Sequence, residues 1–246
     1  MKYCKNCNHA VYDLYCSHCG QKSNPGKITF SFLSNEVFHF FTHLEKGFAF
    51  TSFEMVIHPG KTTKNFIEGK RKSYQPPISY FLIWTTIYIL VLILIEKIFG
   101  KNVVINYKDY FGPSSITHLA ISNLSIVLTV LIPFQALYLF LLVTKKSYNY
   151  FETMVATIYS LGTVIQFQFI FALISLGYYL IKSKPVDLQV SDLFKILYLL
   201  WFITDTVRLY SVKHKIIRAI GFCFMAFGTF TAWRLYGFPI LIKLFI

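Results

Sequence analysis

The feature that most constrains this chain is a series of long apolar stretches that begins after residue 77. A helix needs about 20 mostly apolar residues to cross a bilayer. On that criterion we predict five spans, at about residues 78–96, 119–143, 154–181, 193–209 and 216–236. Hydrophobic residues make up 55% of the chain and charged residues only 14%, whereas soluble domains are about a quarter charged. The expected fold is therefore an all-α membrane bundle over residues 78–246.

The positive charges predict how this bundle is oriented. With the N-terminus in the cytosol, most Lys and Arg residues fall on the cytosolic side, as the positive-inside rule requires. The fourth stretch is the weakest span because Lys195, Asp205 and Arg208 interrupt it. Without this span, however, the basic cluster at 208–218 would lie outside the cytosol.

We relate the net charge of +13 to anionic membrane lipids, so a nucleic-acid partner is not expected. The sequence predicts no oligomeric state.

Two Cys-x-x-Cys pairs, separated by eight residues, stand near the N-terminus. The four cysteines are Cys4, Cys7, Cys16 and Cys19. Four thiolates give the closed tetrahedral site typical of structural zinc. The first 25 residues contain no apolar secretory signal, so we expect a reducing cytosol, where clustered cysteines indicate a metal rather than disulfides. Asn8 and Gly20 follow the pairs and tolerate the left-handed backbone of a tight turn. Residues 1–22 are therefore predicted to form a zinc ribbon, with an iron–sulfur site or a redox dithiol as alternatives.

Residues 23–77 are mixed polar and aromatic, and we predict a linker with amphipathic interfacial helices. One helix is expected over 31–44. Thr51 and Glu54 have the spacing of a capping box, which predicts a second helix that ends at His58. Five cations precede the first span: Lys61, Lys64, Lys70, Arg71 and Lys72. They are interpreted as a topology anchor on anionic lipid or, alternatively, as a site that contacts an anionic headgroup or phosphate.

Polar side chains inside the predicted spans are candidates for function because burying them in lipid is costly. They are Gln135, Gln166, Gln168, Asp205 and Arg208. Gln166 and Gln168 are two residues apart and are expected to face different directions. Asp205 and Arg208 are three apart on one helix, so a local ion pair is expected. No catalytic motif is present, we assign no catalytic residue, and an enzyme is not favoured.

Several motifs resemble those of one family. They are the ribbon through Tyr15–Gln21, then Pro59–Gly60, the run Glu68 to Arg71, Tyr74 and Pro77. This combination is similar to the bacterial zinc-ribbon membrane family known as domain of unknown function 3667, and it covers roughly residues 1–95. The resemblance implies the bacterial inner membrane and no assigned activity. By predicted topology alone, the chain is also similar to Yip1-type proteins, which have five spans and a cytosolic N-terminus.

Three functions are compatible with these features. The leading hypothesis is a membrane scaffold or adaptor whose ribbon recruits a protein partner. The second is a transporter or channel for a small solute or lipid, lined by the polar residues of the spans. The third is a membrane enzyme that acts on an anionic lipid. This last hypothesis predicts a polar cavity at the cytosolic interface that contains Glu54, His58 or Glu68.

Overall fold

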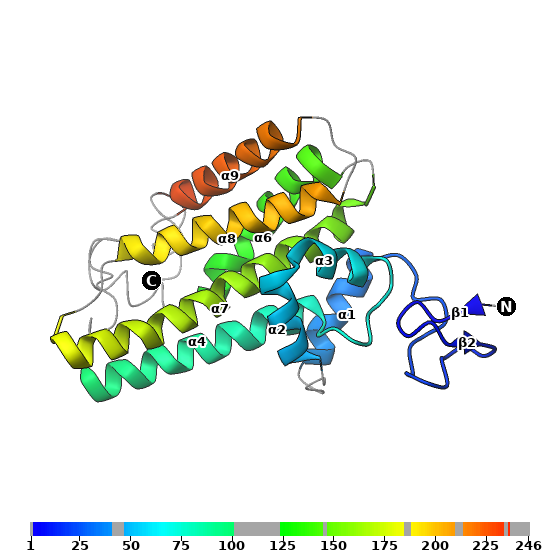
Figure 1. Ribbon diagram of the computed structural model, residues 1–246, viewed down its shortest axis with the longest axis horizontal. Helices are drawn as coiled ribbons and strands as arrows, with labels where there is room; N and C mark the ends of the chain where they lie inside the picture. The colour runs from blue at the N-terminus through cyan, green and yellow to red at the C-terminus, as the bar shows by residue number, and fades with distance from the viewer. Residues whose placement is uncertain are drawn as a thin grey trace.

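A computed structural model describes residues 2–40, 47–100, 124–144, 147–184, 188–209, 214–233 and 236. Within these ranges the protein is mostly helical and has eight α-helices. The cysteine-rich segment lies at one end of the molecule, next to the short helices and beyond the ends of the long ones (Figure 1).

The long helices form a bundle along the longest axis of the molecule (Figure 1). They are α4 (Pro77–Phe99), α6 (Leu124–Leu139), α7 (Tyr150–Lys182), α8 (Leu188–Arg208) and α9 (Lys215–Ala232), and a π-helix, η2 (Phe140–Thr144), continues α6. Helix α7 is central, because it packs against α4, α6 and α8. Helices α7, α8 and α9 run in alternating directions (Figure 1). Two helices of the described residues, α4 and α7, are long and apolar enough to cross a membrane, as judged by length and composition.

The observed ends of α7 differ from the predicted third span for a local reason. The helix begins at Tyr150, four residues before the predicted start, because Asn149 and Glu152 form a capping box. The Asn149 side chain accepts a hydrogen bond from the Glu152 backbone N–H at 2.8 Å, and Glu152 Oε2 accepts one from the Asn149 N–H at 2.9 Å. This satisfies two backbone donors that have no partner within the helix. Residues 119–123 of the predicted second span lie outside the described residues.

Three short helices lie across one end of the bundle: α1 (Phe30–Phe40), α2 (Phe48–Ile57) and α3 (Pro59–Ile67) (Figure 1). They share a hydrophobic core with α4 and α7. Its buried members are Ile28, Leu33, Met55, Phe66, Ile67, Tyr74, Tyr80, Val155 and Tyr159. The segment expected to be a linker with interfacial helices is thus packed as a layer on the bundle. We call α1, α2 and α3 the cap layer.

The predicted capping box at Thr51 and Glu54 is wrong. Helix α2 begins at Phe48, so Thr51 lies inside the helix and is fully buried. Its hydroxyl accepts a hydrogen bond from the Gln75 backbone N–H at 2.8 Å. The Gln75 N–H is buried, and a buried backbone N–H needs a hydrogen-bond acceptor. The Thr51 hydroxyl is that acceptor. The Thr51 side chain therefore joins the cap layer to the chain that enters α4.

Two glycines permit close contacts between helices. A Cβ atom on Gly60 in α3 would lie 2.7 Å from the backbone nitrogen of Thr206 in α8, and one on Gly162 in α7 would lie 2.7 Å from the Tyr80 ring of α4. Any larger side chain would separate these elements. The backbone N–H of Gly60 also donates to the Asp205 carboxylate at 2.8 Å. The Pro59–Gly60 motif therefore places the start of α3 directly on α8.

Candidate metal centre and its docking loop

The cysteine-rich segment consists of two turns with the same backbone pattern. In the first turn, Cys4 N–H donates to His9 at 2.8 Å and Asn8 N–H donates to Cys4 at 2.9 Å. In the second, Cys16 N–H donates to Gln21 and Gly20 N–H donates to Cys16, both at 2.8 Å. Asn8 has φ +58° and Gly20 has φ +72°, as the sequence predicts for residues that close tight turns.

A short antiparallel pairing joins β1 (Lys2–Tyr3) to β2 (Ala10–Val11) beside the first turn. An isolated bridge between Tyr15 and Lys22 frames the second turn. The apolar core of this unit is very small: it holds Val11 and the cysteines themselves. So small an apolar core supplies little burial to stabilise a fold of this size.

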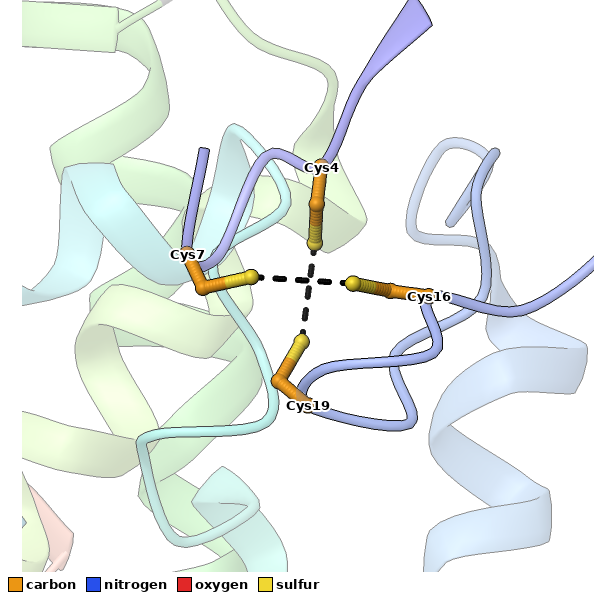
Figure 2. A group of neighbouring side chains, drawn as sticks. All are labelled: Cys4, Cys7, Cys16 and Cys19. Atoms are coloured by element: carbon orange, nitrogen blue, oxygen red, sulfur yellow. Dashed lines mark hydrogen bonds between the residues drawn. The ribbon is translucent and has the colours of Figure 1, made fainter. Parts of the chain in front are cut away.

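The four thiols of the turns converge on one point. Figure 2 shows the sulfur atoms of Cys4, Cys7, Cys16 and Cys19 directed toward a common centre. All four Sγ atoms lie within 4.8 Å of one another, and the pairs Cys4–Cys19 and Cys7–Cys16 are each 3.6 Å apart. Zinc–thiolate bonds of about 2.3 Å place tetrahedral sulfurs about 3.8 Å apart, so the cluster fits a zinc ion. The four cysteines could therefore hold a metal ion such as zinc.

The pKa values of the Cys4 and Cys7 thiols are shifted in opposite directions. Burial raises the pKa of Cys4, but hydrogen bonds from the backbone of Cys7 and Asn6 and from the Cys19 thiol outweigh it and lower the pKa to about 7. A backbone hydrogen bond from His9 lowers the pKa of Cys7, but burial and the other three thiols raise it to about 12. Hydrogen bonds thus favour the thiolate of Cys4, whereas burial and the neighbouring thiols oppose that of Cys7. A divalent cation removes this opposition by neutralising the charge.

The ribbon is docked on the segment that connects α3 to α4. We call Gly69–Ser73 the docking loop. The Gln21 side chain donates from Nε2 to the Gly69 carbonyl at 2.5 Å, and its Oε1 accepts from the N–H groups of Arg71 and Lys72, each at 3.0 Å. Asn6, from the first turn, accepts from the Ser73 N–H at 3.2 Å and from its hydroxyl at 3.0 Å. Both cysteine turns thus hold one loop.

Arg71 fixes the other side of the docking loop. Its guanidinium donates to the carbonyls of Pro25 and Gly26, both at 2.7 Å, and it lies 4.8 Å from the centre of the Phe32 ring. Burial lowers the pKa of Arg71, while Glu36 and Glu152 raise it. Arg71 is therefore a half-buried structural cation that joins the linker, α1 and the docking loop.

The other four cations of the predicted headgroup site have different surroundings. Lys61, Lys70 and Lys72 are exposed, and Lys64 lies 3.9 Å from Glu68 in a surface ion pair. Such a pair contributes little to stability. These lysines are available to anionic groups, whereas Arg71 already has backbone acceptors on three sides.

The five polar residues predicted within the spans lie on α6, α7 and α8 and have different surroundings. Gln166 of α7 accepts a hydrogen bond from the Tyr80 hydroxyl of α4 at 3.0 Å, and Gln168 is half-buried. Gln135 is buried on α6. Asp205 accepts from Gly60 at the start of α3, in place of the expected pairing with Arg208. The Arg208 guanidinium lies 6.0 Å from the Trp201 ring instead.

A cavity of about 840 Å³ lies where the linker, the end of α3 and the start of α7 meet. Lys5 and Lys27 contribute positive charge to its wall, and Glu68 and Glu152 contribute negative charge. The Tyr148 hydroxyl, also at this wall, donates to Glu68 at 3.2 Å. The cavity wall therefore combines apolar surface with charged groups of both signs.

Several of these roles were missed from the sequence alone. Asn6 and Gln21 gave no signal of docking, because their partners are 48 to 67 residues away. The capping box at Asn149 was detectable, since an Asn followed three residues later by Glu precedes an apolar run. Asp205 was identified from the sequence as a polar residue within a span. Its partner could not be identified, because that partner is the backbone N–H of Gly60 and no side chain marks it in the sequence.

Comparison with known proteins supports the family resemblance over one segment. The model of a protein family of unknown function (DUF3667) matches residues 45–89. This segment contains α2, α3, the docking loop and the start of α4. The chain resembles that family there. No curated protein and no solved structure matches the chain, and nothing supports the similarity to Yip1-type proteins.

Proposed function

We propose that this protein is a multi-pass protein of the bacterial inner membrane whose cytosolic zinc ribbon recruits a protein partner. The observation that carries the proposal is an exposed apolar surface on the ribbon. Tyr12 is 77% exposed and Leu14 is 74% exposed, with Tyr3 and Tyr15 also open to solvent. Tyrosine is enriched in protein interfaces, and an apolar surface of this kind on a small unit favours a protein contact.

The exposure of the long helices supports a membrane location. Only 33% of the apolar window of α4 and 28% of that of α7 is buried inside the protein. The core helix of a soluble protein would be mostly buried. Large apolar side chains instead face outward along the bundle, among them Ile98, Ile174, Ile181, Ile216 and Phe224. Lipid tails are the environment that these surfaces require.

Contacts at one end of the bundle support five spans with the N-terminus in the cytosol. The start of α7 meets the linker, where Asn149 donates to the Ile28 carbonyl at 3.2 Å. The end of α8 meets α3 through Asp205, and the start of α9 meets η2 through Arg218 and the Leu142 carbonyl. All these ends lie on the side of the ribbon and its neighbouring cations, which matches the positive-inside rule.

The cap layer supports an interfacial role for α2. This helix runs across the axes of α4 and α7 (Figure 1). Phe50, Phe53 and Ile57 are exposed on α2, and their spacing places them on one face. Helices of this kind lie in the headgroup plane with the apolar face toward the acyl chains. The layer would then hold the ribbon at a fixed height above the membrane.

Site-specific photo-crosslinking in cells tests the adaptor proposal. A photoreactive phenylalanine analogue replaces Tyr12, and in a matched chain it replaces Ser17, which is exposed on the second turn. We expect a protein adduct of discrete mass from position 12 that is lost when Leu14→Ser is added, with zinc content unchanged. Equal adducts from both positions, or none from position 12, would contradict recruitment through this surface.

A second candidate function rests on the cavity where the linker, α3 and α7 meet. Its wall contains Glu68, beside Lys5 and Lys27. Glu68 is one of the three acid or base residues that the lipid-enzyme hypothesis nominates. Retention of an anionic phospholipid through purification, and its loss in a Lys5→Ala/Lys27→Ala variant, would favour this function over the adaptor. Phospholipid content that is unchanged in the variant would count against it.

A further inference from the structure

The docking loop depends on the ribbon for its backbone hydrogen bonds. Three consecutive N–H groups, those of Arg71, Lys72 and Ser73, donate to two ribbon side chains, Gln21 and Asn6. The N–H groups on either side, of Lys70 and Tyr74, bond to backbone carbonyls of their own region. The ribbon thus supplies acceptors for the middle of the loop.

The two ribbon residues that hold the loop are fixed by the metal-binding turns. Asn6 lies between Cys4 and Cys7, and Gln21 follows Cys19 by two residues, with its carbonyl accepting from Cys16 N–H. Their positions therefore depend on the conformation of the two turns. Because the ribbon has almost no apolar core, that conformation depends on the bound metal.

The loop in turn continues directly into the bundle. Gln75, two residues after Ser73, is bonded on both sides: its N–H donates to Thr51 and its carbonyl accepts from the Tyr159 hydroxyl of α7. Pro76 and Pro77 follow, and Pro77 is the first residue of α4. Gly69, at the other end of the loop, has φ +113° and lies against Lys5 and Pro25 so closely that a Cβ would approach both at 2.8 Å.

We infer that metal binding by the ribbon and the ordered conformation of the docking loop are coupled, so that the loop is ordered when the metal is bound and released when it is lost. The coupling lies in Gln21 and Asn6, and it connects the metal centre to the entry of the first span. Coupling of this kind is reciprocal: an ordered loop strengthens metal binding by the same factor by which bound metal favours the ordered loop. The inference requires no partner protein and does not rest on the adaptor proposal.

Hydrogen–deuterium exchange of the full-length protein in detergent tests this inference. We expect the amides of residues 71–73 to exchange on the order of tenfold faster after a zinc chelator is added, while those of α7 stay unchanged. Gln21→Ala should speed exchange at residues 71 and 72 with zinc still bound. Lys22→Ala, an exposed neighbour on the same turn, serves as the matched control and should change nothing.

The reciprocal measurement is the zinc affinity of Gly69→Ala, determined by competition with a chromophoric chelator. The alanine is strained at this φ, and its Cβ meets the side chains of Lys5 and Pro25, so the substitution disfavours the docked conformation of the loop. We expect zinc affinity to fall on the order of tenfold relative to the wild type. Loop exchange that is insensitive to the chelator, zinc affinity unchanged in Gly69→Ala, or a full-length protein without bound metal would each overturn the inference.

Discussion

The ribbon and the cap layer have similar positions at the end of the bundle, but different forces hold them. The ribbon has a core of one valine and its own cysteines, and it attaches through polar side chains to one loop. The cap layer shares a large aromatic and aliphatic core with α4 and α7. Metal loss should therefore disorder the ribbon and leave the cap layer in place.

The largest expected effect follows from removal of metal ligands. A Cys4→Ser/Cys16→Ser variant should lose the metal and unfold the ribbon, because structural zinc in small units contributes about 10–16 kcal/mol of binding free energy. The bundle should keep its helical content, since the described hydrophobic cores that α4 and α7 share with their neighbours contain no residue of the ribbon. Limited proteolysis with circular dichroism checks this. Loss of helical signal in parallel with ribbon cleavage would contradict this difference between the ribbon and the bundle.

A substitution at Gly60 should destabilise the cap layer and the bundle and leave the ribbon folded. In Gly60→Ala the new Cβ meets backbone atoms of Thr206 and Asp205 at 2.7–2.8 Å, and backbone cannot easily move away. We expect the free energy of unfolding to fall by about 2–4 kcal/mol, with zinc content unchanged.

The matched control for this substitution is Gly228→Ala in α9. A Cβ at Gly228 meets nothing within 4 Å, so the change should be neutral or slightly stabilising. Thermal denaturation of both variants in the same detergent measures the difference. Equal midpoints would show that the contact between α3 and α8 does not need glycine.

Arg71 joins the linker and the docking loop to the cap layer, so its loss should weaken that attachment by a moderate amount. Arg71→Ala removes hydrogen bonds to Pro25 and Gly26 and the contact with Phe32, and we expect a cost of about 2 kcal/mol. Arg71→Lys should recover only part of the lost free energy of unfolding, because an ammonium lacks the planar set of N–H donors with which the guanidinium reaches two carbonyls. Lys72→Ala, at an exposed neighbour, should be silent. Urea denaturation distinguishes the three, and a full recovery in the Lys variant would rule out the bidentate role.

The smallest effect belongs to the start of α7. Asn149→Ala removes the cap that accepts from Glu152 N–H and should cost about 1 kcal/mol. Asn24→Ala, at an exposed position of the linker, is the comparison and should cost almost nothing. The difference in melting midpoint between the two variants reports the cap together with the hydrogen bond from the Asn149 amide to the Ile28 carbonyl. A cost confined to the ribbon, with the bundle unaffected, would show that the capping box does not stabilise α7.

Much of the fold could be predicted because it depends on local patterns. The Cys-x-x-Cys pairs and the residues Asn8 and Gly20 predicted both turns of the ribbon, and the apolar runs predicted the long helices. Contacts between distant segments could not be predicted in this way. The roles of Gln21, Thr51 and Asp205 depend on backbone groups that fold next to them from far along the chain. Each side chain is polar and common, so only the assembled neighbours give it a function.

Native mass spectrometry of the full-length protein in detergent tests the central claim most directly. That claim is that four cysteines hold one zinc ion in a ribbon docked on a helical bundle. The account predicts a mass increase equal to one zinc per chain, absent in the Cys4→Ser/Cys16→Ser variant while the variant still purifies from membranes. A wild-type protein that carries no metal, or one that retains zinc in the variant, would contradict it.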